Sequence, residues 1–291
     1  MENRHAYLLM IHNNLAQFKI LLQCLDYEKN DIYVHVDKKV KKFNKDEFSD
    51  IIKKGKLFFL NERLNIRWGG FTQIKCELNL LKEATKIEHS YYHLISGADL
   101  PLKSQEEIYN FFESNYGTEY VHFDSKELKQ EYKERVNKYY FFTGKHKNII
   151  KKIANKIALF FQFNVNRIKN NTILGKGANW FTITNRLALY VLENEKMINK
   201  MYKFTVTADE IFLQSLVLNS EFKENLYNKN YDDNYSSILY SIDWNRGNPY
   251  VYRKEDYDLL IKSNMLFARK FDMNIDSDII YKIRNKVVEN G

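Results

Sequence analysis

The sequence predicts an α/β protein with a mostly parallel central sheet and helices on its faces. Short apolar segments typical of buried strands recur through the first hundred residues, and segments with helical periodicity separate some of them. Strands that alternate with helices of this length form βαβ units and a parallel sheet. A chain of 291 residues that is 44% hydrophobic can form one large domain, 1–291. The predicted strands are 6–11, 31–36, 57–60 and 91–95, with helices at 15–25 and 72–87.

The last third of the sequence returns to the same α/β pattern. Apolar alternation predicts a strand just before residue 185, and helical periodicity follows it. Two further helices are predicted near the C-terminus. The elements expected here are strands 179–184 and 237–242 and helices 186–197, 209–218, 255–261 and 276–287.

Charge and cysteine content indicate the kind of partner and the cellular compartment of the protein. The net charge of +8 indicates a polyanionic partner, which is a nucleic acid, an anionic membrane or a phosphorylated substrate. No nucleic-acid-binding motif is present, so we expect no nucleic-acid partner. Cys24 and Cys76 are too few for a disulfide framework, which favours a reducing cytosol. We expect no signal peptide and no membrane span, hence a cytoplasmic protein, and the abundance of Lys, Asn, Ile and Tyr suggests a bacterial source.

A basic segment near 145–170 combines cations with apolar residues at helical spacing. One interpretation is a helix lying on an anionic membrane surface. The alternative is an amphipathic helix packed on the domain with solvated lysines. The cations are Lys145, Lys147, Lys151, Lys152, Lys156, Arg167 and Lys169, and the apolar residues are Ile149, Ile150, Ile153, Ile157, Phe160 and Phe161.

Seven separate segments, in order and spacing, resemble one family. They are HVDKK (35–39), RWGG (67–70), YHLISGADLPLKS (92–104), GANWF (177–181), ADE (208–210), IDW (242–244) and LFARKFD (266–272). Together they are similar to the core-2/I-branching enzymes, glycosyltransferase family 14, over about 6–285. That family includes β-1,6-N-acetylglucosaminyltransferases, peptide O-xylosyltransferases and bacterial polysaccharide enzymes. The resemblance implies a GT-A-like fold, a UDP-sugar donor, inversion at the anomeric carbon and no metal ion. It also implies a nucleotide-binding half, about 1–123, and an acceptor-binding and catalytic half, 124–291.

Glu210 is the predicted catalytic base. An inverting transferase needs one carboxylate to take the proton of the acceptor hydroxyl. By position alone, Asp209 and Glu210 could simply complement the dipole of the helix that they begin. The resemblance places the family's catalytic glutamate at Glu210.

The leaving diphosphate needs positive charge, and the sequence offers cations for it. The Asp-x-Asp sequence at 276–278 is better explained as a helix cap than as a metal site. No cluster of His, Cys, Asp and Glu has metal-ligand spacing, so we expect neither metal nor cofactor. The resemblance places the diphosphate-binding lysine at Lys270 and the arginine at or beside Arg246, while Arg269 adjoins Lys270. Charge-assisted contacts to phosphate can replace a metal, although these cations could also be surface residues.

The remaining site residues bind the donor and the acceptor. Ligands bind at the carboxyl ends of parallel strands, where Asp37 and Asp99 are expected, although both could instead serve turns. Trp180 and Trp244 could stack on a sugar ring or belong to the core, and His5 and His93 are expected in the core or at a sheet edge. The resemblance adds Ile11, His12 and Arg67 to the donor set, with Asp124 and Arg135 as acceptor contacts.

We therefore expect a metal-independent, inverting transferase of UDP-N-acetylglucosamine. UDP-xylose and UDP-galactofuranose remain alternative donors, and a non-catalytic sugar- or polyanion-binding protein is the alternative function. The expected acceptor is a glycan or lipid-linked glycan in bacterial surface polysaccharide synthesis. The expected location is the inner face of the membrane.

Overall fold

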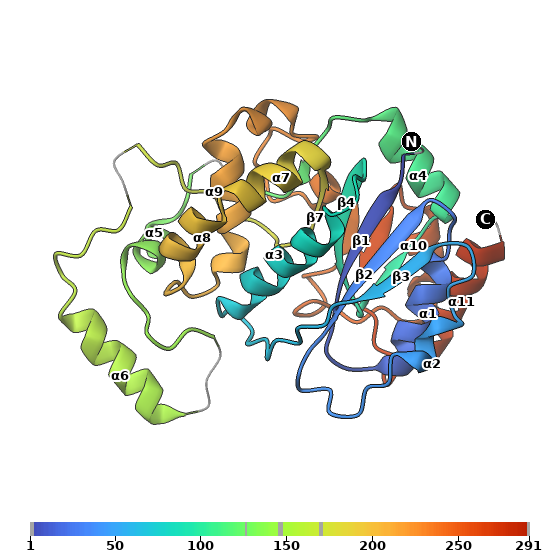
Figure 1. Ribbon diagram of the computed structural model, residues 1–291, viewed down its shortest axis with the longest axis horizontal. Helices are drawn as coiled ribbons and strands as arrows, with labels where there is room; N and C mark the ends of the chain where they lie inside the picture. The colour runs from blue at the N-terminus through green and yellow to red at the C-terminus, as the bar shows by residue number, and fades with distance from the viewer. Residues whose placement is uncertain (1–2, 126, 145–147, 169–170, 290–291) are drawn as a thin grey trace.

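The computed structural model describes residues 3–125, 127–144, 148–168 and 171–289. Its centre is a six-stranded sheet of order β3-β2-β1-β4-β7-β6. The first four of these strands are parallel, and β7 and β6 join antiparallel at one edge. The predicted GT-A-like α/β architecture is confirmed (Figure 1). The strands are β1 (His5–Ile11), β2 (Asn30–Val36), β3 (Lys56–Phe59), β4 (Tyr91–Ser96), β6 (Tyr120–Val121) and β7 (Phe181–Thr184).

Helices cover both faces of the sheet (Figure 1). On one face lie α3 (Thr72–Ala84) and α7 (Asn185–Glu193), and on the other lie α1 (Leu15–Leu25) and α11 (Ser277–Glu289). Among the described residues, no helix is both long and apolar enough to span a membrane. The other helices are α2 (Asp46–Ser49), α4 (Gln105–Ser114), α5 (Gln130–Asn137), α6 (Ile149–Phe160), α8 (Glu195–Tyr202), α9 (Phe212–Leu218) and α10 (Tyr257–Lys262).

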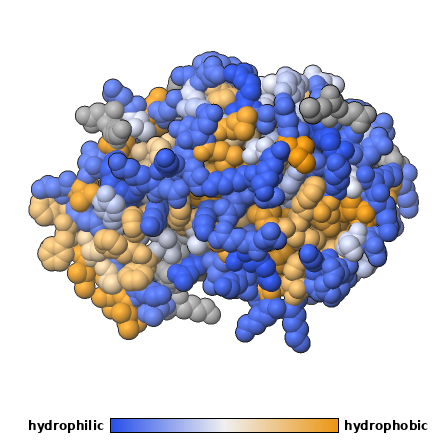
Figure 2. All heavy atoms as spheres, in the orientation of Figure 1, coloured by the Kyte–Doolittle hydropathy of each residue, from blue (hydrophilic) through white to orange (hydrophobic). Residues whose placement is uncertain are grey.

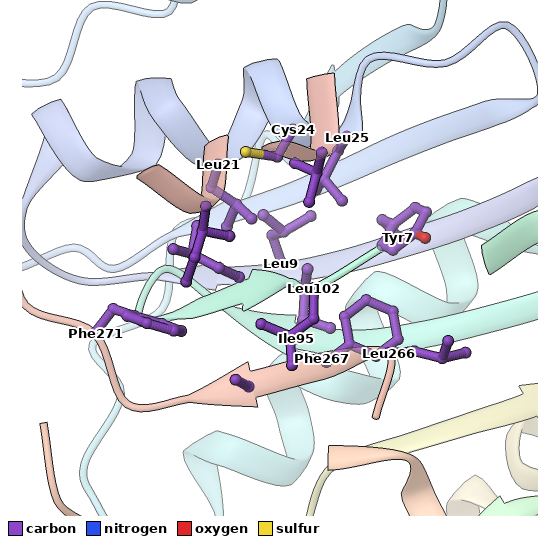
Figure 3. Close-up of a cluster of buried hydrophobic side chains, with 14 of the residues drawn as sticks. Tyr7, Leu9, Leu21, Cys24, Leu25, Ile95, Leu102, Leu266, Phe267 and Phe271 are labelled. Carbon is purple, nitrogen blue, oxygen red and sulfur yellow. The ribbon is translucent and has the colours of Figure 1, made fainter. Parts of the chain in front are cut away.

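The strands supply alternate side chains to two hydrophobic cores. Tyr7 and Leu9 of β1 enter the core beneath α1 and α11, part of which Figure 3 shows. Leu8 and Met10 enter the core beneath α3 and α7. This alternation follows from the two-residue repeat of a strand. His5 and His93 are fully buried in strands, as predicted.

A second, three-stranded sheet joins the C-terminal part of the chain to the end of β4. Its order is β5-β9-β8, with β5 (Asp99–Pro101), β9 (Phe267–Arg269) and β8 (Tyr240–Ile242). Asp99 and Arg269 are partners in the β5–β9 register. The sheet therefore holds Arg269 at the carboxyl end of β4.

Four predicted elements differ in detail. The helix expected at 186–197 is two helices, α7 and α8, separated at Asn194. The helix expected at 209–218 begins as a 3-10 turn, Ala208–Glu210, which is separated from α9 at Ile211, where φ is −126°. The strand expected at 237–242 is a 3-10 turn and then β8, with Leu239 left-handed between them.

The fourth difference concerns the basic segment. Helix α6 covers only Ile149–Phe160, and the side chain of Asn148 caps its first turn. The alternative in which its apolar residues pack on the domain is wrong, because no residue of α6 is buried. Lys145, Lys147 and Lys169 lie outside the described residues.

Candidate active site

A cleft of about 520 Å³ lies beyond the carboxyl ends of β1, β2 and β4. This is the end at which parallel sheets bind ligands. The predicted site residues that line it are Ile11, His12, Asp37, Asp124, Trp180, Glu210, Trp244 and Arg269. Arg67, Asp99, Arg135, Arg246 and Lys270 are not among the lining residues.

Glu210 is held at the cleft wall by backbone hydrogen bonds. Its carbonyl oxygen accepts the N–H of Gly177 at 2.9 Å, and the nearby Thr207 N–H donates to Gly69 at 2.9 Å. The Glu210 side chain is 34% exposed, so its carboxylate is available to a ligand. Burial raises the pKa of Glu210, and the positive charge of Lys176 opposes this rise. A carboxylate with a raised pKa is a better proton acceptor than an ordinary surface glutamate.

Lys176 is a site residue that sequence reasoning missed. Its ammonium lies 3.4 Å from the Glu210 carboxylate and also donates a hydrogen bond to Asp124. Burial alone would lower the pKa of Lys176, but Asp124 and Glu210 raise it to about 12. The lysine is therefore a permanent cation between two acids. In the sequence, only its position directly before the GANWF segment (177–181) indicated that Lys176 could belong to the site.

Arg269 presents fixed positive charge to the cleft. Its guanidinium donates to the buried carboxylate of Asp99 at 2.6 Å and to the Ser96 hydroxyl at 3.0 Å. It also lies 4.3 Å from the centre of the Trp180 ring. Asp99 in turn accepts the Ser96 N–H at 2.7 Å, so it orients the loop and the arginine rather than lining the cleft.

The donor side of the cleft carries charges of both signs, since the Lys39 ammonium lies 3.1 Å from the Asp37 carboxylate. Asp37 accepts the N–H groups of Lys39 at 2.8 Å and Ile66 at 3.3 Å, so it serves a turn and also lines the cleft. Burial lowers the pKa of His12, and the charges of Lys39 and Lys270 lower it further. These cations therefore act on the same small region, which suits a diphosphate.

Two predicted cations have protein partners outside the cleft, and a third lies on a loop. Arg246 donates to Asp243 at 2.5 Å and to Asp256 at 2.8 Å. Arg135 donates to the Thr207 hydroxyl at 3.0 Å, in the segment that carries Glu210. The exposed Arg67 lies on the loop before α3. Direct ligand contacts by these residues stay predictions.

Two tryptophan rings also line the cleft. Trp244 is 48% exposed, which is too open for a core tryptophan, and lies 6.3 Å from Tyr235 between ring centroids. Trp180 packs against both hydrophobic cores and still lines the cleft. Both indoles offer a surface on which a sugar ring can stack.

One cluster of possible metal ligands appears among the described residues, although no ligand spacing in the sequence predicted it. Ligand atoms of His122, Asp124 and Asp233 lie within 4.8 Å of one another. The Nδ1 atom of His122 accepts the Ala178 N–H at 3.0 Å, and Asp124 is neutralised by Lys176. One ring nitrogen of His122 and the Asp124 carboxylate are therefore already engaged by protein groups, which disfavours a cation at this cluster. The Asp276 side chain caps α11 by accepting the N–H groups of Asp278 and Ile279, as predicted.

Two buried acids lie behind the cleft wall. Burial raises the pKa of Asp209 to about 7, and the charge of Glu210 adds to the rise. Burial also raises the pKa of Glu77, which accepts a hydrogen bond from Asn179 at 3.3 Å. Asp209 and Asn179 both reach the cleft. Both acids therefore keep their protons at a higher pH than an ordinary carboxyl group does.

Together, the sheet, the cleft at its carboxyl ends, the carboxylate at the wall and the fixed cations define a GT-A-like glycosyltransferase fold. The family model of the Core-2/I-Branching enzyme matches residues 5–261, and the chain belongs to that family.

Individual relatives are distant. Xylosyltransferase 2 of Canis lupus familiaris is 19% identical over 296 residues, and that of Homo sapiens is 20% identical over 305 residues. Each match covers 95% of this chain and 33% of the relative, so the chain spans about a third of their length. A probable β-1,3-galactosyl-O-glycosyl-glycoprotein β-1,6-N-acetylglucosaminyltransferase 7 of Sus scrofa is 27% identical over 114 residues, covering 38% of this chain and 27% of the relative.

Proposed function

We propose that this chain is an inverting glycosyltransferase that moves a sugar from a UDP-sugar to a hydroxyl group of a glycan, with Glu210 as general base and without a metal ion. The observation that carries the proposal is the position of Glu210, half-buried at the wall of the same cleft that Arg269 and Asp37 line. A carboxylate base and positively charged side chains in one cleft are what direct displacement at the anomeric carbon requires.

In this mechanism Glu210 takes the proton of the acceptor hydroxyl as the oxygen bonds to the anomeric carbon. The bond from that carbon to the diphosphate oxygen breaks with its electron pair, and UDP leaves. Attack from the face opposite the leaving group inverts the configuration. Arg269, with Lys39 and Lys270 nearby, takes up the negative charge of UDP. Asp124 and Trp244 contact the acceptor.

UDP-N-acetylglucosamine and UDP-xylose are the first donors to test, because relatives carry the names of both activities. UDP-galactofuranose is a third. We place the reaction in bacterial surface polysaccharide synthesis at the inner face of the membrane, on a glycan or lipid-linked glycan. The net charge of +8 and the basic segment support this setting.

The test is transfer from a panel of UDP-sugars by the wild type and by Glu210→Gln. We expect turnover to fall by about 10²–10⁴-fold, because removing a general base has an effect of this size. UDP affinity should stay near that of the wild type, and Glu47→Gln, a change at an exposed glutamate of α2, should leave turnover intact. Sugar binding without turnover by the wild type would instead favour the non-catalytic alternative. Strict dependence on Mn²⁺ in the presence of EDTA would overturn the metal-free mechanism.

A further inference from the structure

Helix α6 turns its apolar side chains away from the rest of the protein. No residue of its 12 is buried, and Ile150 and Phe160 are 72% and 78% exposed. An amphipathic helix of a globular domain normally places this stripe against the core. Figure 2 shows hydrophobic atoms gathered at the lower left, where α6 lies in Figure 1. The exposed apolar residues of α6 and the turn after it are Ile149, Ile150, Ile153, Ile157, Phe160, Phe161 and Phe163.

The opposite face of α6 attaches the helix through polar side chains. Asn155 donates to the Phe142 carbonyl at 2.8 Å and accepts the Phe142 N–H at 3.1 Å. Just after the helix, Gln162 accepts the Tyr139 N–H at 2.7 Å and donates to the Tyr139 carbonyl at 3.0 Å. These paired bonds fix the rotation of α6 about its axis. The apolar face of α6 is therefore held pointing away from the rest of the protein.

Positive charge borders the apolar stripe. Lys152 and Lys156 are exposed, and their spacing of four residues places them in one row along the helix. The sequence has no Asp or Glu between residues 135 and 192 that could neutralise them. A partner for this face must therefore be apolar in its interior and anionic at its surface.

We propose that α6 docks the protein on the surface of a bilayer that contains anionic lipid. The isoleucine and phenylalanine side chains enter the boundary between headgroups and acyl chains, and Lys152 and Lys156 contact lipid phosphates. A polynucleotide would satisfy the lysines and leave seven large apolar residues in water. A second copy of the chain would cover those residues but bring the same unneutralised cations together.

A residue close in sequence to α6 lies near the edge of the cleft. A Cβ atom built on Gly144 would be 2.9 Å from the Arg67 Cβ and 3.3 Å from the Trp68 carbonyl oxygen. Gly144 therefore packs on the loop that carries Trp68, which lines the cleft and is 67% exposed. Docking would bring the cleft close to a lipid-linked acceptor. That consequence rests on the proposed function, whereas docking itself does not.

The test is flotation of the full chain with phosphatidylcholine vesicles, with and without phosphatidylglycerol. We expect binding only with phosphatidylglycerol and weaker binding at high salt. Ile157→Ser/Phe160→Ser should weaken it at least tenfold by removing apolar contact, and Lys152→Glu/Lys156→Glu should do so by reversing charge. The matched controls, Leu259→Ser on α10 and Lys53→Glu/Lys54→Glu before β3, change equally exposed residues elsewhere and should bind like the wild type.

Absence of binding to anionic vesicles would overturn the proposal, as would equal losses in the controls. Self-association that Ile157→Ser/Phe160→Ser abolishes, without vesicle binding, would overturn it in favour of a second copy. Circular dichroism of each variant verifies that the fold is intact. The assay needs no turnover, so an inactive but membrane-binding protein would refute the proposed function alone.

Discussion

The ammonium of Lys176 lies 3.4 Å from the carboxylate of Glu210 and is shared with Asp124. Burial raises the pKa of Glu210, and Lys176 limits that rise. The lysine thus keeps the proposed base ionised at a lower pH than burial alone would allow. It acts through Glu210 and is a positioning residue in this scheme.

Replacing Lys176 by Met should shift the pH dependence of the reaction. Without the cation the ionised form of Glu210 is less stable, so its pKa rises further. The acidic limb of kcat/KM against pH should therefore move to higher pH, while Lys176→Arg, which keeps the charge, should leave the limb close to that of the wild type. A loss of kcat with an unmoved limb would show that Lys176 has another role.

The sequence predicted the sheet and its ligand-binding end because these follow from local apolar patterns. The four parallel strands appear within about one residue of the expected bounds. Glu210 was selected on resemblance, and the cleft independently includes it with Asp37 and Asp124. Lys176 was missed, because its importance depends on contacts with Asp124 and Glu210, which are distant in sequence.

Tertiary contacts also explain why the partners of Arg246 and the orientation of α6 could not be predicted from the sequence. Arg246 follows the short strand β8, and its side chain bends back to Asp243 and reaches Asp256. The outward rotation of α6 depends on hydrogen bonds from Asn155 to Phe142. Helical periodicity shows that the apolar residues share one face of the helix, but not whether that face points toward the core or toward solvent.

Arg269 and Arg246 should differ in their effect on UDP affinity. Arg269 lines the cleft, so its loss should weaken UDP binding about tenfold or more, the range for a charge-assisted hydrogen bond. Because Arg269→Gln would strand the buried Asp99 carboxylate, the variant to use is Arg269→Gln/Asp99→Asn. Arg246→Gln should bind UDP with affinity closer to the wild type. Calorimetric titration with UDP measures both, and equal losses would mean that Arg246 leaves Asp243 and Asp256 to bind the ligand.

Gly177→Ala should destabilise the fold and displace Glu210. A Cβ atom at this position would lie 1.8 Å from the His122 carbonyl oxygen. A main-chain atom cannot move aside as the end of a flexible side chain can. We expect a loss of about 1–3 kcal/mol or more in the free energy of unfolding, as for an overpacked site. Because Gly177 donates to the Glu210 carbonyl, activity should fall as well. Gly117→Ala is the control: φ is +95° but nothing lies within 4 Å of the new Cβ, so it should lose stability through backbone strain alone and keep kcat.

Asp209→Asn should make the protein more stable at alkaline pH. Burial, with the charge of Glu210, raises the pKa of Asp209 from 3.8 to about 7. The folded state thus binds this proton more tightly than the unfolded state, and stability is lost as pH rises from about 4 to 7. Asparagine is neutral at every pH and avoids this loss. The gain of Asp209→Asn over the wild type should grow through that window and approach about 4 kcal/mol at pH 8, since each pKa unit corresponds to about 1.4 kcal/mol.

Urea denaturation at a series of pH values measures the difference, which isolates Asp209 from the other buried acids such as Glu119. Asp258→Asn, a change at an exposed acid of α10, should show no such growth. A gain that is constant with pH would mean that Asp209 keeps one charge state throughout. A gain largest at low pH would mean that its carboxylate is stabilised rather than penalised by the fold.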